Sequence, residues 1–378
     1  MPPAETSDPP LKRTALHALH QAQGAKLVPF AGYEMPVSYP LGILKEHLHT
    51  RAAAGLFDVS HMGQATLRGA KAAAAMESLV PGDIRGLAPG ETRYSLLLNE
   101  AGGILDDLMI TRPRGEGQND SLFLVVNAAC KDADFAHIEA QLAGRAELQR
   151  LEDRALLALQ GPKAAEVLAR HCPQTEDLLF MTVAPLAVAG IDCLVSRSGY
   201  SGEDGFELSL ASSQAESLAK LLLDAPEVEP IGLGARDSLR LEAGLCLYGH
   251  DIDETTTPVE AGLSWAIGKR RRADGGFPGA EIILKQLKEG APRRRVGIRA
   301  AGRAPVREGA VLTDPGGREI GKVTSGGFGP SVGAPVAMGY VERDYAKPGT
   351  ALTAIVRDKP LEAEVARLPF IETKYRKA

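Results

Sequence analysis

The chain has 378 residues, of which 44% are hydrophobic and 24% charged, and its formal net charge at pH 7 is −5. This composition is typical of a globular protein, and the length predicts two or three domains rather than one. The negative net charge gives no overall attraction for nucleic acid or for an anionic membrane surface, so neither is expected as a partner.

Targeting, redox and metal signals are weak in this sequence. No apolar run approaches the roughly 20 residues that a membrane-spanning helix requires. Residues 1–13 are rich in proline and include Glu5 and Asp8, unlike a secretory signal or a transit peptide. The four cysteines and eight histidines are scattered, without the spacing of a disulfide framework or a metal site. We therefore expect a cytoplasmic protein with reduced thiols and no bound metal.

The first part of the chain predicts helices and strands in irregular alternation. Apolar periodicity and terminating glycines favour helices, and alternating residues favour short strands between them. The expected helices cover residues 14–23, 43–54, 71–80 and 134–143, and the expected strands cover residues 56–62 and 64–68. The helices 71–80 and 134–143 are amphipathic and are expected to cover one side of a sheet.

A β-hairpin is expected between residues 94 and 111. Two apolar runs flank the sequence Asn99-Glu-Ala-Gly-Gly103, whose glycines adopt positive φ at little steric cost. A third apolar run, residues 122–127, is expected to join the same sheet. The second strand of this hairpin carries two adjacent carboxylates, Asp106 and Asp107, among apolar residues.

This pair of aspartates requires an explanation, because Asp is disfavoured in strands and costly to bury without a partner. Successive side chains of a strand point to opposite faces, so Asp106 and Asp107 are expected to face opposite sides. At most one of them faces a shared pocket, and the other faces solvent or a structural partner. From the residues alone, a structural role for both explains the pair as well as a functional role for one.

The second part of the chain continues the mixture of strands and helices. Without strict βαβ repetition, this order predicts an α+β fold. Strands are expected over residues 155–160, 188–198 and 205–210, and helices over residues 163–171, 214–223 and 234–244. From residue 296 onwards, short alternating strands and the turn Asp314-Pro-Gly-Gly317 predict a small all-β domain, with a boundary near residue 290.

The glycine-rich segments do not match the motifs of several common nucleotide-binding and catalytic sites. Gly232 and Gly234 begin like a dinucleotide fingerprint, but Asp237 stands where the third glycine belongs. Residues 326–333 lack the Lys-Ser/Thr of a phosphate loop, and no G-x-S-x-G hydrolase motif occurs. These glycines are therefore interpreted as turn residues.

The turn at residues 198–207 is more unusual. A plain turn explains its glycines and first acids, but not Tyr200 and Glu207 at its two ends. A carboxylate beside an aromatic ring suits a flat heterocycle that offers N–H donors. Arg236, which follows two glycines, is suited either to bind a carboxylate or to make a structural ion pair.

Together, these segments resemble the aminomethyltransferase, or T-protein, of the glycine cleavage system. The matching segments run in the same order and extend, with weaker likeness at both ends, from about residue 14 to Tyr375. They are FAGYEMPV (30–37), LFDVSHM (56–62), NEAGGILDDL (99–108), VNAA (126–129), ALQGP (158–162), GYSGEDGFE (199–207), GARDSLRLE (234–242) and TPVEAGLSW (257–265). No single segment is decisive, but the ordered set is highly specific.

The resemblance implies a three-domain α+β cloverleaf around a central cavity that holds tetrahydrofolate. The domains would comprise residues 1–55 with 145–290, residues 56–144, and an all-β barrel-like domain of residues 291–378. Asp107 matches the family's catalytic position, in agreement with the argument that only one of the two aspartates faces a site. The other residues expected at the folate site are Met62, Tyr94, Asn127, Tyr200, Glu207, Arg236, Trp265 and Tyr375.

The resemblance also implies the reaction and its partner. The one-carbon unit of an aminomethyl group, carried on the lipoyl arm of H-protein, would pass to tetrahydrofolate. The products would be 5,10-methylenetetrahydrofolate, ammonia and the dihydrolipoyl carrier. Asp107 would accept a hydrogen bond from the folate nucleophile and support the developing positive charge. The basic runs 269–272 and 293–295, each typical of a solvated face, are candidate docking sites for the acidic carrier.

Two alternatives share most of these features. The enzymatic alternative is a related folate-dependent demethylase acting on a free methylated metabolite, or a detached folate-binding portion of an amine dehydrogenase, and it would have a similar folate pocket. A non-enzymatic folate-binding scaffold of the iron–sulfur maintenance type would share the fold, but its Lys-Gly-Cys-Tyr-x-Gly-Gln motif is absent here.

Overall fold

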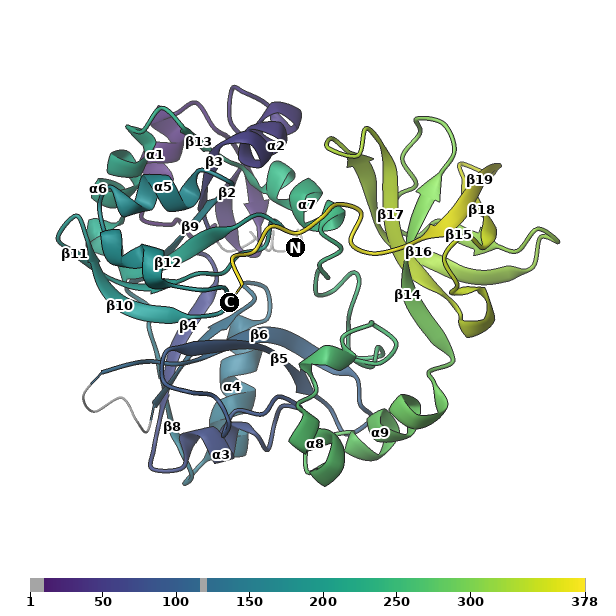
Figure 1. The fold of residues 1–378 in the computed structure, drawn as a ribbon, viewed down its shortest axis with the longest axis horizontal. Coiled ribbons are helices and arrows are strands. Elements are labelled where there is room, and N and C mark those ends of the chain that lie inside the picture. The colour runs from purple at the N-terminus through teal and green to yellow at the C-terminus, as the bar shows by residue number, and fades with distance from the viewer. Residues whose placement is uncertain (1–9, 116–120, 378) are drawn as a thin grey trace, which may run out of the picture.

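The computed structural model describes residues 10–115 and 121–377, which form three lobes arranged around a common centre (Figure 1). The first lobe is built on a six-stranded sheet with the order β10-β11-β12-β9-β3-β13. All of its neighbouring strands are antiparallel except β13 and β3. Its strands are β3 (Ala54–Asp58), β9 (Arg154–Gln160), β10 (Val183–Val188), β11 (Ile191–Ser196), β12 (Gly205–Ala211) and β13 (Val228–Pro230).

Helices cover both faces of this sheet. One core is formed mainly by leucines of the strands packed against α1 (His17–Ala22), α5 (Ala164–Ala169) and α6 (Ser212–Leu223). On the other face, Ala235 and Leu239 of α7 (Leu233–Glu242) pack against Phe57. The lobe also contains the hairpin β1 (Lys26–Phe30) and β2 (Tyr33–Ser38), α2 (Ile43–Ala52) and the 3₁₀ helix η1 (Pro173–Asp177).

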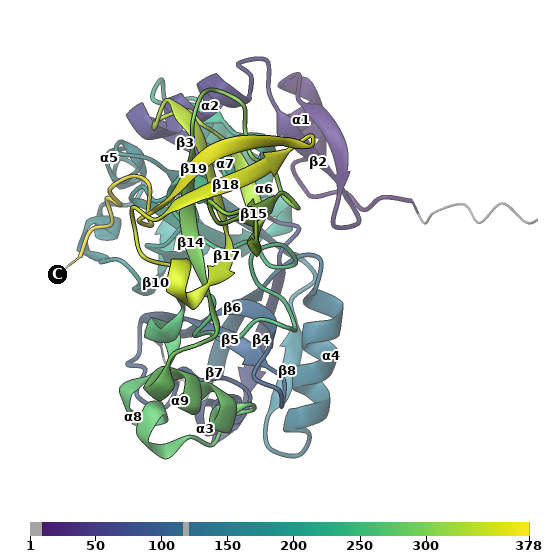
Figure 2. The same ribbon diagram turned by 90° about the vertical axis from the view of Figure 1, so that its right-hand side faces the viewer.

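The second lobe contains a five-stranded sheet with the order β5-β6-β7-β4-β8. Its strands are β4 (Gly63–Arg68), β5 (Glu91–Leu98), β6 (Ile104–Arg112), β7 (Ser121–Val126) and β8 (Glu147–Arg150). α3 (Ala72–Met76) and α4 (Lys131–Leu142) share one core with this sheet, which Phe135 and Ile138 of α4 enter. Figure 2 shows α4 lying beside the sheet. The other face of the sheet packs against a segment that includes η2 (Ser264–Ala266), α8 (Lys269–Asp274) and α9 (Ala280–Glu289).

The third lobe is a closed six-stranded barrel with its own apolar core. It consists of β14 (Arg293–Ala300), β15 (Val311–Thr313), β16 (Glu319–Gly329), β17 (Ala334–Glu342), η3 (Arg343–Tyr345), β18 (Ala351–Val356) and β19 (Lys359–Ala366). The C-terminal segment leaves the barrel and returns to the first lobe (Figure 1). There, the backbone N–H of Lys374 donates to the carbonyl of Gly202 at 2.9 Å.

The fold class agrees with the sequence analysis: the molecule is α+β with a C-terminal β-barrel. The predicted hairpin is present as β5 and β6, and β7 pairs with β6 as expected. Several helices are shorter than predicted. The first covers only His17–Ala22, the second ends at Ala52, and the third covers only Ala72–Met76.

The packing divides the chain differently from the predicted domain ranges. β3 was expected to begin the unit of residues 56–144, but it pairs with β9 and β13 of the first lobe. All five of its residues are buried, as in a central strand covered on both faces. β8 pairs with β4 of the second lobe, and the segment from Cys246 to Ala291 packs on that lobe as well. These partners are distant in sequence, so composition alone did not reveal them.

Candidate active site

Asp106 and Asp107 lie on β6 and face different surroundings. Burial alternates along the strand, so that Asp106 is fully buried and Asp107 is half-buried. Asp106 lies on the α4 side of the sheet, and Asp107 pairs with Leu96, whose side chain packs on the opposite side. A register shift leaves Leu105 without a partner on β5, as in a β-bulge. The arrangement agrees with the expected alternation of the two carboxyl groups.

Asn127 connects the two carboxyl groups. It directly follows β7, so its side chain extends past the end of the strand pair. Its amide nitrogen Nδ2 donates to Asp107 Oδ1 at 2.6 Å and to Asp106 Oδ1 at 2.8 Å. Its backbone N–H donates to Asp106 Oδ2 at 3.2 Å. Asn127 thus holds both aspartates in a fixed relation.

The electrostatics of Asp107 suit proton handling. Burial and the nearby charge of Asp106 raise the pKa of Asp107 to about 7, while hydrogen bonds from Tyr94 and Asn127 oppose this rise. A carboxyl group with a pKa near neutrality exchanges a proton readily under physiological conditions. Asp107 is therefore suited to act as a general base or hydrogen-bond acceptor.

Aromatic side chains adjoin Asp107. Tyr94, on the neighbouring strand β5, hydrogen-bonds Asp107 and stacks on Trp265, with ring centroids 5.2 Å apart. Trp265 lies in η2 and is 64% exposed, which is unusual for so large an apolar side chain. The pair provides an open aromatic surface next to the carboxyl group.

Tyr200 and Arg236 bring the first lobe into the same cluster. The guanidinium of Arg236 on α7 lies 4.7 Å from the centre of the Tyr200 ring. The Tyr200 hydroxyl donates to the carbonyl of Cys246. Burial raises the pKa of Tyr200, and the charge of Asp107 raises it further. Burial lowers the pKa of Arg236, whereas Tyr200 and Glu207 counteract this effect.

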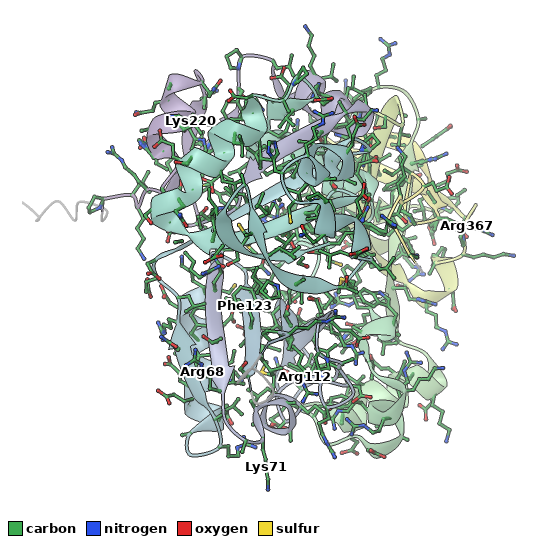
Figure 3. The ribbon with its side chains drawn as sticks, turned by 60° about the vertical axis from the view of Figure 1, so that its left-hand side comes forward. Arg68, Lys71, Arg112, Phe123, Lys220 and Arg367 are labelled. Carbon is green, nitrogen blue, oxygen red and sulfur yellow. The ribbon has the colours of Figure 1, made fainter. Side chains whose placement is uncertain are left out.

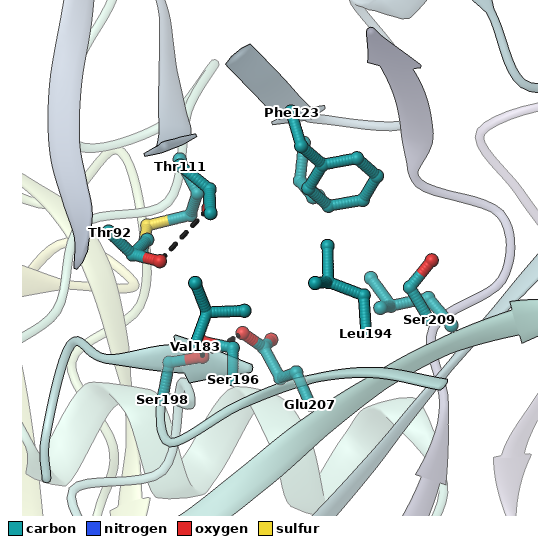
Figure 4. A pocket seen from close by; sticks show the side chains of 12 residues that line it. Thr92, Thr111, Phe123, Val183, Leu194, Ser196, Ser198, Glu207 and Ser209 are labelled. Atoms are coloured by element: carbon teal, nitrogen blue, oxygen red, sulfur yellow. Dashed lines mark hydrogen bonds between the residues drawn. The ribbon is translucent and has the colours of Figure 1, made fainter. Parts of the chain in front are cut away.

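Glu207 lies where the two sheets face each other, at a small cavity of about 20 Å³ (Figure 4). Thr111 and Phe123 enter this cavity from the second lobe, and Glu207 enters it from the first; the position of Phe123 between the lobes is also visible in Figure 3. Glu207 Oε2 accepts a hydrogen bond from Ser198 Oγ at 2.5 Å. Because Met109 and Thr111 line the cavity and share the strand face of Asp107, Glu207 lies across from that face.

The remaining two predicted residues, Met62 and Tyr375, both pack against the first lobe. Met62 packs against the apolar layer beneath α7, from which Arg236 projects. Tyr375 stacks on Phe180, with ring centroids 4.1 Å apart and planes inclined by 13°. Its contacts among the described residues tie the C-terminal segment to the first lobe, and none of them reaches Asp107.

The structure adds residues that the sequence analysis missed. His61 is buried, its Nδ1 atom has no hydrogen-bond partner among the described residues, and burial lowers its pKa to about 4. Asp134 on α4 is buried beside Asp106. A signal for Asp134 was present, because it shares a helix face with Phe135 and Ile138, where a carboxylate is unexpected.

The two basic runs are largely engaged within the molecule. Arg270 pairs with Glu77 and Asp83, and the buried Arg271 donates to the carbonyl of Glu77 at 2.7 Å. Arg295 donates to the carbonyls of Ala261 and Gly244. The side chains of arginines 270–272, 293 and 295 therefore bind other parts of the same molecule. This makes them poor candidates for a docking surface. Within residues 10–115 and 121–377, the side chains of Lys269 and Arg294 form no hydrogen bond or ion pair.

The described part of the chain offers neither a membrane-spanning helix nor a cluster of three metal ligands. No helix there is long and apolar enough to cross a membrane. No group of three or more His, Cys, Asp or Glu side chains among those residues is arranged to hold a metal ion.

Comparison with known proteins identifies the family. Residues 16–271 match the GCVT N-terminal domain, and residues 293–372 match the glycine cleavage T-protein C-terminal barrel domain. The mitochondrial aminomethyltransferase of Dictyostelium discoideum is 48% identical over 97% of this chain and 94% of its own length. That of Gallus gallus is 49% identical, with the same two coverages of 97% and 94%.

A solved structure agrees with this result. The crystal structure of the glycine cleavage system aminomethyltransferase T from Bartonella henselae superposes with a TM-score of 0.91. It is 48% identical and covers 97% of this chain and 100% of its own. The chain therefore belongs to the glycine cleavage T-protein family of aminomethyltransferases.

Proposed function

We propose that this aminomethyltransferase transfers the one-carbon unit from aminomethyl-lipoyl H-protein to tetrahydrofolate. The products are 5,10-methylenetetrahydrofolate, ammonia and dihydrolipoyl H-protein. Family membership supports the reaction class, and one observation in this molecule carries the assignment of the site. Asp107, with a pKa of about 7, hydrogen-bonds Tyr94 and Asn127 of its own lobe. It also lies close enough to Tyr200 of the first lobe to raise the pKa of that tyrosine.

The residues of the cluster fit a reduced folate. Trp265 and Tyr94 offer a stacked aromatic surface of which a large part is open, and this suits a flat pterin ring. Glu207 offers a carboxylate to ring N–H donors. Among the described residues, Arg236 forms no ion pair with a carboxylate, so its guanidinium is available for an anionic part of the ligand.

The nucleophile in this reaction is a nitrogen of the folate substrate, so the protein contributes positioning and electrostatics. Asp107 accepts a hydrogen bond from that nitrogen and, when ionised, stabilises positive charge that develops on the transferred carbon. Asn127 and Tyr94 each donate a hydrogen bond to Asp107 and keep its carboxyl group in one orientation. No covalent bond between substrate and protein is required.

The carrier partner follows from the same reaction. H-protein is proposed to present its lipoyl arm to Asp107, with Lys269 and Arg294 as the members of the basic runs left to contact an acidic surface. The relatives from D. discoideum and G. gallus are named as mitochondrial proteins. For this chain a cytoplasmic location stays a prediction from its sequence.

Release of ammonia from aminomethylated H-protein tests the proposal. We expect release that depends on tetrahydrofolate, with 5,10-methylenetetrahydrofolate formed in equal amount. As a control, free methylated amines should not replace the loaded carrier. Turnover of such an amine, without activity on the carrier, would instead indicate a folate-dependent demethylase.

A further inference from the structure

A third carboxyl group lies behind the Asp106–Asp107 pair. Asp134, in the first turn of α4, is only 4% exposed. Its side chain hydrogen-bonds that of Asp106, which is fully buried. Within the described residues, no salt bridge is formed by Asp106, Asp107 or Asp134. Three acidic groups, two of them buried and one half-buried, thus lie together without a paired cation.

These three groups cannot all be ionised. Two carboxylates are both acceptors, so a hydrogen bond between Asp106 and Asp134 requires that one of them carries a proton. Negative charges on the buried Asp106 and Asp134, beside the half-buried Asp107 and without a paired cation, would also cost several kcal/mol each, on the order estimated for unpaired ions. The titratable groups next to the three carboxyls are neutral or acidic: Tyr94, Cys130, Tyr200, Cys246, Tyr248 and Glu254. The cations Arg236 and Arg240, also among the described residues, act on Tyr200, and neither forms a salt bridge with the three carboxyls.

The donors around each group indicate where the proton lies. Burial raises the pKa of Asp106, but Asp106 accepts hydrogen bonds from the backbone N–H and the Nδ2 atom of Asn127, and these donors oppose that rise and favour the ionised carboxylate. Asp134 Oδ2 has no hydrogen-bond partner among the described residues. Burial and the charges of Asp106 and Asp107 hold the pKa of Asp134 well above its ordinary value. The proton therefore lies on Asp134.

We propose that Asp134 is a positioning residue for the transfer reaction. Its protonated carboxyl group donates to Asp106, ionised Asp106 holds the amide of Asn127, and that amide orients Asp107. In addition, the negative charge on Asp106 keeps the proton affinity of Asp107 high. The catalytic part of this inference rests on the proposed function, whereas the protonation of Asp134 is measurable without substrate.

The protonation is tested first, in the ligand-free protein with the isosteric variant Asp134→Asn. Infrared difference spectra at about pH 9, where Asp107 with its pKa of about 7 is ionised, are expected to show a protonated-carboxyl band in the wild type that this variant lacks. An acid with a raised pKa in the folded state stabilises the fold fully below its ordinary pKa of 3.8 and loses this contribution as pH rises. The unfolding midpoint of Asp134→Asn should therefore increase relative to wild type between acid and neutral pH.

The infrared and stability results together decide whether Asp134 is protonated. The missing band together with a difference in midpoint that grows with pH supports a protonated Asp134. An unchanged band, or a difference in midpoint that does not vary with pH, overturns it. Asp177→Asn, in η1 of the first lobe, is a matched control that should alter neither measurement.

The positioning role is tested by comparing Asp134→Asn with Asp134→Leu. Asparagine keeps a donor toward Asp106, whereas leucine removes it, so Asp106 takes up a proton and no longer repels charge on Asp107. For the leucine variant we expect turnover at least about tenfold lower and an acid limb of the pH profile shifted down by about one unit. The asparagine variant should retain the wild-type acid limb and recover most of the lost turnover.

The outcomes separate this inference from the proposed function. Equal loss of turnover in both variants, or an unmoved acid limb in Asp134→Leu, contradicts the positioning role. If Asp134→Leu does not fold, Asp106→Asn replaces it, because loss of the Asp106 charge must shift the acid limb in the same direction. If wild-type protein releases no ammonia, the proposed function fails, while the infrared and stability measurements still decide the state of Asp134.

Discussion

Tyr94 hydrogen-bonds Asp107 and at the same time stacks on Trp265, with the two ring planes inclined by 30°. One side chain thus links the proposed catalytic carboxyl group to an aromatic surface that is largely open. Trp265 is held there by the short helix η2, which packs on the second lobe beside Leu96 and Leu98. Tyr94 lies on β5 and Asp107 on the paired strand β6. The pairing of these strands therefore also sets the distance between the aromatic surface and Asp107.

The first prediction concerns ligand affinity. Trp265 is the only tryptophan of the chain, so its fluorescence should change when tetrahydrofolate binds. Trp265→Ala should weaken binding by about 0.5–1.5 kcal/mol, the range for one aromatic stacking contact. Titration calorimetry measures this difference. Phe328→Ala, which removes an exposed aromatic ring from the barrel, should bind with wild-type affinity.

The second prediction concerns the role of Asp107. Asp107→Asn should lower turnover by about 10²–10⁴-fold, the usual contribution of a general acid or base, with little change in folate affinity. The assay is ammonia release from aminomethylated H-protein under saturating folate. Wild-type turnover by this variant would remove Asp107 from the mechanism. Asp106→Asn, which alters a fully buried acceptor, should reduce stability more than turnover.

The third prediction concerns pH. The reaction requires ionised Asp107, whose pKa is raised to about 7 by burial and by Asp106. Protonation below that value removes the acceptor, so kcat/KM should fall as pH decreases through about 7. In Asp106→Asn the repulsive charge is absent, and the acid limb should lie at lower pH. A profile that is flat between neutral pH and pH 5, with folded enzyme throughout, would rule out titration of Asp107.

The fourth prediction concerns the attachment of the barrel. Arg240 on α7 is 3% exposed and donates to Asp251 Oδ2 at 2.7 Å, and Ser325 of β16 donates to the same carboxylate at 2.9 Å. Arg240→Met leaves the buried carboxylate uncompensated and should cost about 3–5 kcal/mol of unfolding free energy. Urea unfolding measures this loss. Arg318→Met, which breaks an exposed pair with Glu342, should leave the unfolding midpoint unchanged.

Short-range features were predictable because they depend on neighbouring residues. The glycines between residues 99 and 103 specify a turn, and the apolar runs on either side specify the strands that it joins. Alternation along one of these strands separates Asp106 from Asp107. The resemblance to the T-protein family then selected Asp107, Tyr200 and Arg236, which the fold brings into one cluster.

The sequence by itself determined the fold class, the hairpin and the alternation of its two aspartates, because each depends on residues close along the chain. Only the tertiary structure decided that β3 belongs to the first lobe and β8 to the second, which is the reverse of the predicted ranges. It also decided that Asp134 lies against Asp106, and that most arginines of the basic runs are engaged internally. Such pairings join residues far apart in the chain, and their free energy depends on burial and charge that exist only after the lobes have packed.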